Sequence, residues 1–294
     1  MSHRLVWIAG VILSFHLIAY LSAAETEAPP LRFAPLPMED EKLLNEAFYG
    51  FVRYLSAQTG RTIQVVHFVD YADLLKSFGA GEIDLAYLGP LPYAVISQRF
   101  KQITPIACFR EQDGESRYTC SLVAYGESDI DLSAPGAVHI GLTQPYSTCG
   151  YLAVSQMLAS VGQDLGRPPI SFSYAGSHTE AALGVVQGRY DLAGVKTAVA
   201  NHYRHLNLKT LAVSRPFPGF GLFANNETVD GATILRLRDA LLRLDPRHIE
   251  ADRQLVSSWG ESLRNGAVVA EQCDYSGVID AMQQLPWPIP GTAP

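Results

Sequence analysis

Short apolar segments of strand character alternate with longer amphipathic segments along most of this chain, and this alternation restricts the fold more than any other feature. The apolar side chains of 41–59, for example, recur at helical spacing, and Gly60 follows as a helix terminator. The pattern predicts an α/β fold. Strands are predicted at 31–35, 63–68, 83–88, 103–109, 118–125, 138–142, 170–174, 191–195, 209–213 and 220–224, and helices at 41–59, 71–78, 92–100, 148–161, 178–187, 197–205, 231–244 and 248–259.

The series of strands and helices is interrupted twice, near 125–128 and at the breaker-rich segment Pro216–Gly219. We therefore expect a chain that crosses between two lobes twice. Residues 25–125 would begin lobe 1, 126–216 would form lobe 2, and 217–294 would return to lobe 1 and end in a tail. A length of 294 residues suits two lobes better than one small core. The cleft between the lobes is the expected ligand site.

The first 24 residues have the pattern of a secretory signal peptide. Arg4 precedes an almost wholly apolar stretch, Leu5–Leu21, and Ser22-Ala23-Ala24 supplies small residues for cleavage. Residues 1–24 are therefore predicted to direct export to the periplasm and to be removed. No cysteine stands at the cleavage point, so we do not expect a lipid anchor there.

Charge and cysteine content restrict the partners. The formal net charge of −7 argues against nucleic acid or an anionic membrane surface, although backbone dipoles can still hold a small anion. The four cysteines (Cys108, Cys120, Cys149 and Cys273) match no zinc spacing. In an oxidising compartment they would form disulfides, with three pairings open. One pairing, between Cys108 and Cys120, would close a hairpin around Asp113-Gly114.

Two predicted helices begin directly after a strand with residues that favour anion binding. The first begins at Ser147-Thr148-Cys149-Gly150, where Ser147 would cap the helix and the first N–H groups would stay unpaired. The second begins at Gly176-Ser177-His178, where Ser177 and Glu180 would form a capping box and His178 would point outward. Each of these segments taken alone is explained by ordinary helix capping. Together they predict a cradle for an oxyanion.

These helix starts belong to a longer series of motifs: Asp70-Tyr71-Ala72, Asp84–Pro90, Asp113-Gly114 followed by Tyr118, Ser147–Gly150 and Gly176–His178. Their order and spacing resemble the periplasmic binding proteins of phosphonate, phosphite and phosphate ABC transporters, over nearly the whole chain from about Leu31. The resemblance implies an α/β, two-lobed type II periplasmic binding fold with a hinge and an interlobe cleft. It implies six ligand-binding residues: Tyr71, Tyr118, Ser147, Thr148, Cys149 and His178.

The same resemblance implies a monomer that captures a small oxyanion for an inner-membrane ABC permease; we expect no enzyme activity, cofactor or metal. Two departures from the family pattern bear on the ligand. Cys149 stands where the family usually has serine, and Lys196 and Ala198 stand where aminophosphonate binders place carboxylates. An amine-bearing phosphonate is therefore not expected, and Lys196 would either add positive charge near the cleft or lie in solvent.

Two alternatives depend on the cysteines. In the first, the protein would sense arsenite or another oxyanion together with a membrane histidine kinase. Cys108 and Cys120 would then serve as thiol ligands beside Cys149, because trivalent arsenic prefers thiolates. In the second, Cys149 would be an enzyme nucleophile with His178 as its base. Both alternatives require free thiols.

Overall fold

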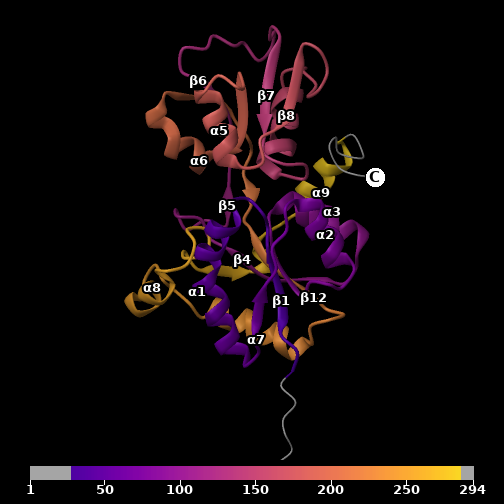
Figure 1. The fold of residues 1–294 in the computed structure, drawn as a ribbon, viewed down its shortest axis with the longest axis vertical. Helices are drawn as coiled ribbons and strands as arrows, with labels where there is room; N and C mark the ends of the chain where they lie inside the picture. Colours follow the sequence, from indigo (N-terminus) through magenta and orange to yellow (C-terminus); the bar gives the residue numbers. More distant parts are fainter. Residues whose placement is uncertain (1–27, 286–294) are drawn as a thin grey trace, which may run out of the picture.

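The computed structural model describes residues 28–285, which form two α/β lobes stacked along the long axis of the molecule (Figure 1). The predicted signal peptide, residues 1–24, lies outside the described residues. Lobe 1 contains a six-stranded sheet, lobe 2 contains a five-stranded sheet, and a two-stranded ribbon lies between them. Among residues 28–285, no helix combines the length and the apolar character that a bilayer crossing requires.

Lobe 1 has the strand order β13-β4-β12-β3-β1-β2. β1 pairs in parallel with β2 and β3, whereas β12, which returns from lobe 2, pairs antiparallel with β3 and β4. The strands are β1 (Leu31–Pro35), β2 (Ile63–Val65), β3 (Leu85–Leu88), β4 (Ile103–Phe109), β12 (Gly221–Asn225) and β13 (Ala267–Val269). The helices are α1 (Glu41–Thr59), α2 (Tyr71–Gly79), α3 (Pro90–Arg99), α7 (Gly231–Leu242), α8 (Glu250–Val256), the short η3 (Ala270–Gln272) and α9 (Ser276–Gln283).

Lobe 2 has the strand order β10-β6-β9-β7-β8. β7 pairs in parallel with β8 and β9, and β6 pairs antiparallel with β9 and β10. The strands are β6 (Cys120–Tyr125), β7 (Val138–Leu142), β8 (Ile170–Tyr174), β9 (Leu192–Lys196) and β10 (Leu208–Val213). The helices are the π-helix η1 (Thr148–Ala153), which continues into α4 (Val154–Ala159), then α5 (His178–Val186), α6 (Thr197–His202) and the short η2 (Tyr203–Leu206).

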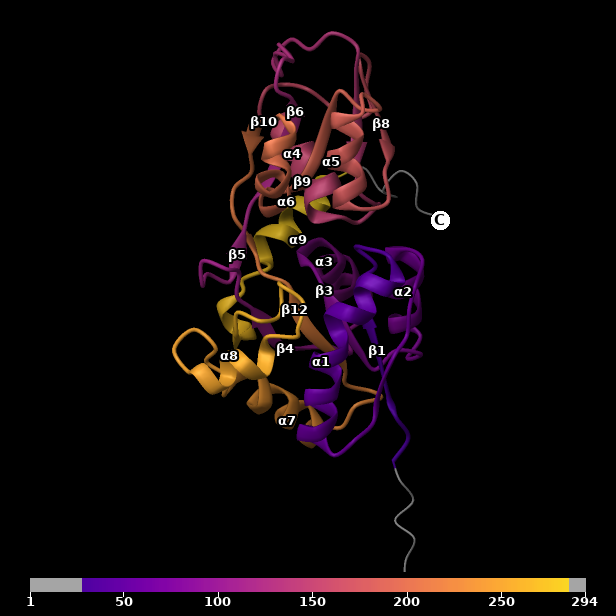
Figure 2. The same ribbon diagram turned by 60° about the vertical axis from the view of Figure 1, so that its left-hand side comes forward.

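The ribbon between the lobes pairs β5 (Arg117–Tyr118) with β11 (Phe217–Pro218) (Figure 2). The predicted hairpin of 103–109 with 118–125 is wrong, because β4 stays in the sheet of lobe 1 and β6 pairs within lobe 2. The chain therefore changes lobe before Cys120 and not near 125–128. The turn at Gly114 does form, but a turn does not determine which sheet the next strand joins.

Helix α1 shows why the sequence folds in this way. Asp40 caps its start by accepting the N–H of Leu43 at 3.0 Å, and Gly60 ends it in the left-handed conformation, with φ of 68°. Phe48 and Phe51 on its apolar face pack against Phe33 of β1, with ring centroids 5.4 and 6.1 Å away. Each such buried aromatic side chain contributes about 1.5–3 kcal/mol through removal from water. This packing makes the sheet of lobe 1 a rigid support.

All four cysteines are paired. Cys108 of β4 bonds Cys273 within lobe 1, and Cys120 of β6 bonds Cys149 of η1 within lobe 2. The pairing of Cys108 with Cys120 that the turn allowed is wrong, because the two residues lie in different lobes. Neither disulfide joins the lobes, so neither prevents them from moving about the ribbon.

We predict that the native protein does not react with a maleimide unless it is first reduced. After unfolding and reduction, mass spectrometry should count four labelled cysteines. The double substitution Cys108→Ala with Cys273→Ala should lower the free energy of unfolding by about 2–5 kcal/mol in a denaturant titration. Labelling of Cys149 in the native, unreduced protein would contradict the pairing.

Candidate ligand-binding site

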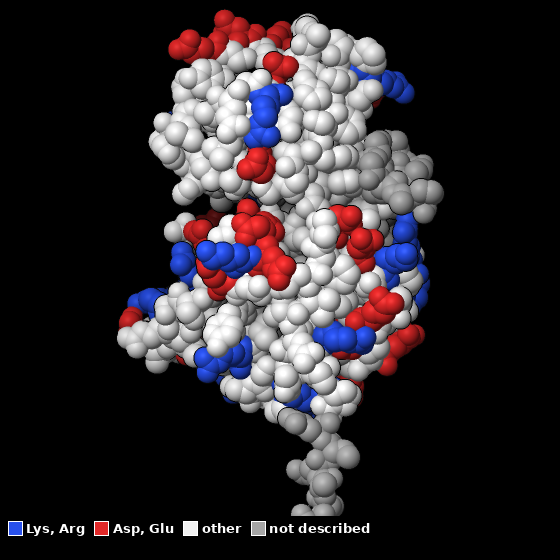
Figure 3. Space-filling view, viewed as in Figure 1, with Lys and Arg blue, Asp and Glu red and all other residues white. Residues whose placement is uncertain are grey.

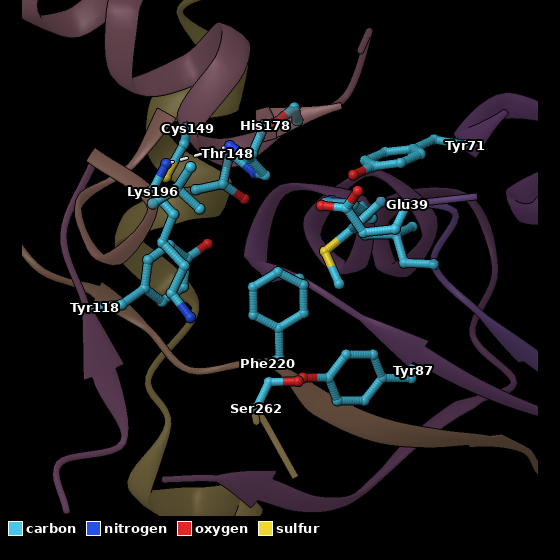
Figure 4. A pocket seen from close by; sticks show the side chains of 16 residues that line it. Glu39, Tyr71, Tyr87, Tyr118, Thr148, Cys149, His178, Lys196, Phe220 and Ser262 are labelled. Atoms are coloured by element: carbon cyan, nitrogen blue, oxygen red, sulfur yellow. Dashed lines mark hydrogen bonds between the residues drawn. The ribbon is translucent and has the colours of Figure 1, made fainter. Parts of the chain in front are cut away.

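A cavity of about 160 Å³ lies between the two lobes (Figure 4). All six residues that were predicted to bind the ligand line it: Tyr71, Tyr118, Ser147, Thr148, Cys149 and His178. Their contact with a ligand stays a prediction, but the fold brings them together from three places, namely lobe 1, the ribbon and lobe 2. The other lining residues are Leu36, Met38, Glu39, Tyr87, Gly89, Pro92, Lys196, Val199, Phe220 and Ser262.

The start of η1 supplies backbone donors. β7 ends at Leu142, a turn follows, and the Ser147 hydroxyl oxygen accepts the N–H of Gly150 at 3.0 Å. Gly150 lies so close to Thr143 that a side chain at this position would collide with it. Within residues 28–285, the backbone N–H groups of Thr148 and Cys149 donate to no acceptor. These two donors are therefore available to an anion at the positive end of the helix.

The start of α5 supplies a ring donor. Ser177 caps it by accepting the N–H of Glu180 at 3.1 Å, but the capping box is only half formed, because the Glu180 carboxylate pairs with Arg189 at 3.0 Å. The Nδ1 of His178 accepts the N–H of Lys196 at 3.2 Å, which leaves the proton on Nε2. Burial, followed by the charge of Lys196, lowers the pKa of His178 to about 4. The ring is thus a neutral donor.

The two predicted tyrosines also line the cavity. Tyr71, from the start of α2, and Tyr118, from the ribbon, are both buried, with 3% and 7% of their surfaces exposed. Burial raises the pKa of both hydroxyl groups above the ordinary value, and Glu39 adds to this at Tyr71. Both hydroxyls therefore keep their protons. Thr148, which interacts with Tyr118, also accepts the N–H of Leu91 in lobe 1 at 3.0 Å.

Lys196 is not a free cation. Its Nζ lies 2.7 and 2.8 Å from the two carboxylate oxygens of Glu111, which follows β4 in lobe 1. The same Nζ lies 5.0 Å from the ring centroid of Tyr118 and 5.7 Å from that of Phe220. The expectation that Lys196 lies in solvent or adds charge to the cleft is therefore replaced by an ion pair that joins the lobes. Glu111 and Glu39 were not predicted, because no sequence motif marks either residue.

The thiol alternatives fail in this structure. The sulfur of Cys149 is bonded to Cys120, and that of Cys108 to Cys273, so none has a thiolate for arsenic or for nucleophilic attack. The predicted thiol ligands Cys108 and Cys120 do not line the cavity either. Within the described part of the chain, no group of three or more His, Cys, Asp or Glu side chains is arranged to hold a metal ion.

The sequence profile of one protein family matches residues 33–275; it describes the periplasmic substrate-binding proteins of phosphonate ABC transporters. The phosphate-import protein PhnD of Mycolicibacterium smegmatis is 26% identical over 179 residues. That alignment covers 58% of this chain and 56% of the relative, so the chain matches little more than half of that protein's length.

Two solved structures share the fold. A binding component of a phosphonate ABC transporter from Pseudomonas aeruginosa has a TM-score of 0.72 at 21% identity and covers 87% of both chains. PhnD1 of Prochlorococcus marinus, solved with methylphosphonate, has a TM-score of 0.73 at 16% identity and covers 86% of this chain and 97% of its own. At these identities the likeness establishes architecture, and the predicted two-lobed type II periplasmic binding fold is confirmed.

We predict that His178 stays neutral, as the Nε2–H tautomer, from about pH 8 down to about pH 5, because its pKa is about 4. Long-range ¹⁵N–¹H correlation NMR with selectively labelled histidine measures this directly. Since the ordinary pKa is 6.5, the unfolded chain takes up this proton first, and the stability that the neutral ring contributes should fall as the pH drops below 6.5. A His178 that titrates near 6.5 would be inconsistent with the buried, Lys196-bonded ring.

Proposed function

The chain belongs to the family of periplasmic substrate-binding proteins of phosphonate ABC transporters, and we propose that its cavity captures a small alkylphosphonate for delivery to a membrane permease. One observation carries this proposal. The cavity is lined by hydrogen-bond donors from two helix starts (the donor wall) and by five apolar side chains (the apolar wall), of which Phe220 is labelled in Figure 4. A phosphonate has both an oxyanion and a carbon substituent, and each would face the wall that suits it.

The donor wall fits an oxyanion. The free N–H groups of Thr148 and Cys149 and the Nε2–H of His178 come from different helices, so they approach from different directions. A tetrahedral anion needs donors arranged in this way, and hydrogen bonds to a charged acceptor are the strong ones. Because Ser147, Thr148 and Cys149 are buried, hydrogen bonds made there are stronger than at an exposed surface.

The apolar wall favours an organic substituent over inorganic phosphate. It contains Leu36, Met38, Pro92, Val199 and Phe220. None of these five side chains can donate a hydrogen bond, so a phosphate oxygen turned toward them would lose its water without compensation, which is unfavourable. An alkyl group there would be removed from water instead. The volume of about 160 Å³ lies below that of drug-sized pockets and fits a ligand of few heavy atoms.

Contacts across the cleft support capture by closure of the lobes. Gln144 of lobe 2 donates to the carbonyl oxygen of Pro37 in lobe 1 at 2.8 Å, and Leu91 donates to Thr148. Together with the ion pair of Lys196 these contacts describe a closed cleft. Opening about the β5–β11 ribbon would admit the ligand, and closing would bring Tyr71 and Tyr118 over it.

The mature protein would act as a monomer in the periplasm, after export through residues 1–24. Its role would be binding without catalysis, and its protein partner would be an inner-membrane permease, as the family implies. The lobes would divide at the ribbon, before Cys120 and near Phe217.

We predict that isothermal titration calorimetry will detect methylphosphonate binding and weaker or undetectable binding of inorganic phosphate. Ser147→Ala and His178→Ala should each make the free energy of methylphosphonate binding less favourable by about 1–3 kcal/mol, because each removes or disorders a donor to a charged oxygen. His202→Ala, an exposed histidine at the end of α6, is the matched control and should bind normally. If both site variants kept full affinity, the oxyanion would have to bind elsewhere.

A further inference from the structure

One carboxylate on the cavity wall has no cation beside it. Glu39 lies between β1 and α1, is half-buried, and forms no ion pair within the described residues. We propose that the cavity accepts a singly charged, protonated oxyanion, and that Glu39 receives a hydrogen bond from the acidic O–H of that ligand. This inference rests on the proposed function, since it concerns the same cavity, and it specifies the charge state that the site selects.

The charges around the cavity argue against a doubly charged ligand. Lys196 is the only lysine or arginine among the described residues that line it, and both oxygens of Glu111 compensate its charge. His178 is neutral. The remaining formal charge is the negative one on Glu39. A dianion would therefore meet no uncompensated cation and would depend on neutral donors alone.

The position of Glu39 suits an acceptor of a ligand proton. Among residues 28–285, the one hydrogen bond to its Oε1 is long, 3.4 Å, and comes from the hydroxyl of Thr179 across the cleft. Figure 4 shows its carboxylate beside the Tyr71 hydroxyl, on the opposite side of the cavity from Thr148 and His178. An oxyanion held by the helix starts would thus point its far side toward Glu39. A carboxylate accepts hydrogen bonds and donates none, so a bare oxygen there would be repelled and an O–H would be held.

The surroundings of Glu39 add negative charge. Beyond the cavity, the mouth of the cleft is acidic, and Figure 3 shows acidic side chains on lobe 1 next to the hollow between the lobes. Burial raises the pKa of Glu39 above its ordinary value; the hydrogen bond from Thr179 opposes this shift, and the carboxylates of Asp40 and Glu180 add to it. The titratable and charged groups of lobe 1 that face Glu39 or share its cleft are Asp40, Glu41, His67, Tyr71 and Glu111. Those of lobe 2 are His178 and Glu180 of α5 and Lys196 of β9.

An alkylphosphonate that keeps one acidic proton, and so carries a single negative charge, suits both the donors and the acceptor of this cavity. Two of its oxygens can accept from the starts of η1 and α5, its O–H can donate to Glu39, and its carbon substituent can lie against Met38 and Phe220. The fully ionised phosphonate has no proton for Glu39. Sulfate and methanesulfonate also lack this proton, so the same contact would exclude them.

The test is calorimetric titration of methylphosphonate at several pH values between about 6 and 8.5. In the wild-type protein the affinity should fall about tenfold per pH unit above the second ionisation of the ligand, because only the monoanion binds. Sulfate should bind at least about 100-fold more weakly than methylphosphonate. In Glu39→Gln, which replaces the acceptor by a neutral amide that can also donate, the pH slope should flatten and sulfate should bind more tightly.

Glu180→Gln is the matched control. This substitution also removes one negative charge, but at the mouth of the cleft. The Glu180 side chain is 53% exposed, pairs with Arg189 and does not line the cavity. The variant should keep the wild-type slope. If the pH slope flattened equally in both variants, the negative potential at the mouth of the cleft, and not contact with Glu39, would set the preference for the monoanion. That result would overturn the inference.

The wild-type slope is informative by itself, so the test does not depend on the variant folding; circular dichroism of Glu39→Gln checks that separately. Affinity that stays level or rises with pH would overturn the selection of the monoanion while leaving phosphonate capture intact. Failure of any phosphonate to bind at any of these pH values would overturn the proposed function as well.

Discussion

The site depends on backbone N–H groups that helix geometry leaves without acceptors. The first turn of any helix has such groups, and in this protein η1 and α5 both begin at the edge of the lobe 2 sheet that faces lobe 1. The hydroxyl of Ser147 accepts one N–H of η1, and that of Ser177 accepts one N–H of α5. The N–H groups of Thr148 and Cys149 remain for a ligand. Binding an anion in this way needs no net positive charge, which is consistent with a chain of formal charge −7.

The remaining structure holds these helix starts in place and still lets the lobes move. The disulfide of Cys120 with Cys149 ties the start of η1 to β6, so the donor turn is anchored next to the ribbon that joins the lobes. The ion pair of Lys196 with Glu111 crosses the cleft and has a different effect. It holds the lobes together and, at the same time, removes the one cation that a dianion would seek.

Local features were predictable from single motifs, whereas most tertiary contacts were not. The caps at Ser147 and Ser177 were predicted correctly, because each depends on residues within one turn of the helix. The partners of the four cysteines, the transfer of β6 to lobe 2 and the positions of Glu39 and Glu111 depend on segments far apart in the chain. β13 and α9 were missed because they are short, with three and eight residues. The six predicted ligand residues came together because the motif series carried tertiary information that no single motif holds.

The most direct test of this account is a crystal structure of the protein with methylphosphonate. The account predicts that two phosphonate oxygens lie within hydrogen-bond distance of the Thr148 and Cys149 N–H groups and of His178 Nε2. It also predicts that the third oxygen faces Glu39 and that the methyl group lies against the apolar wall. A ligand bound outside this cavity, or one whose oxygens contact Lys196 in place of the helix starts, would contradict it.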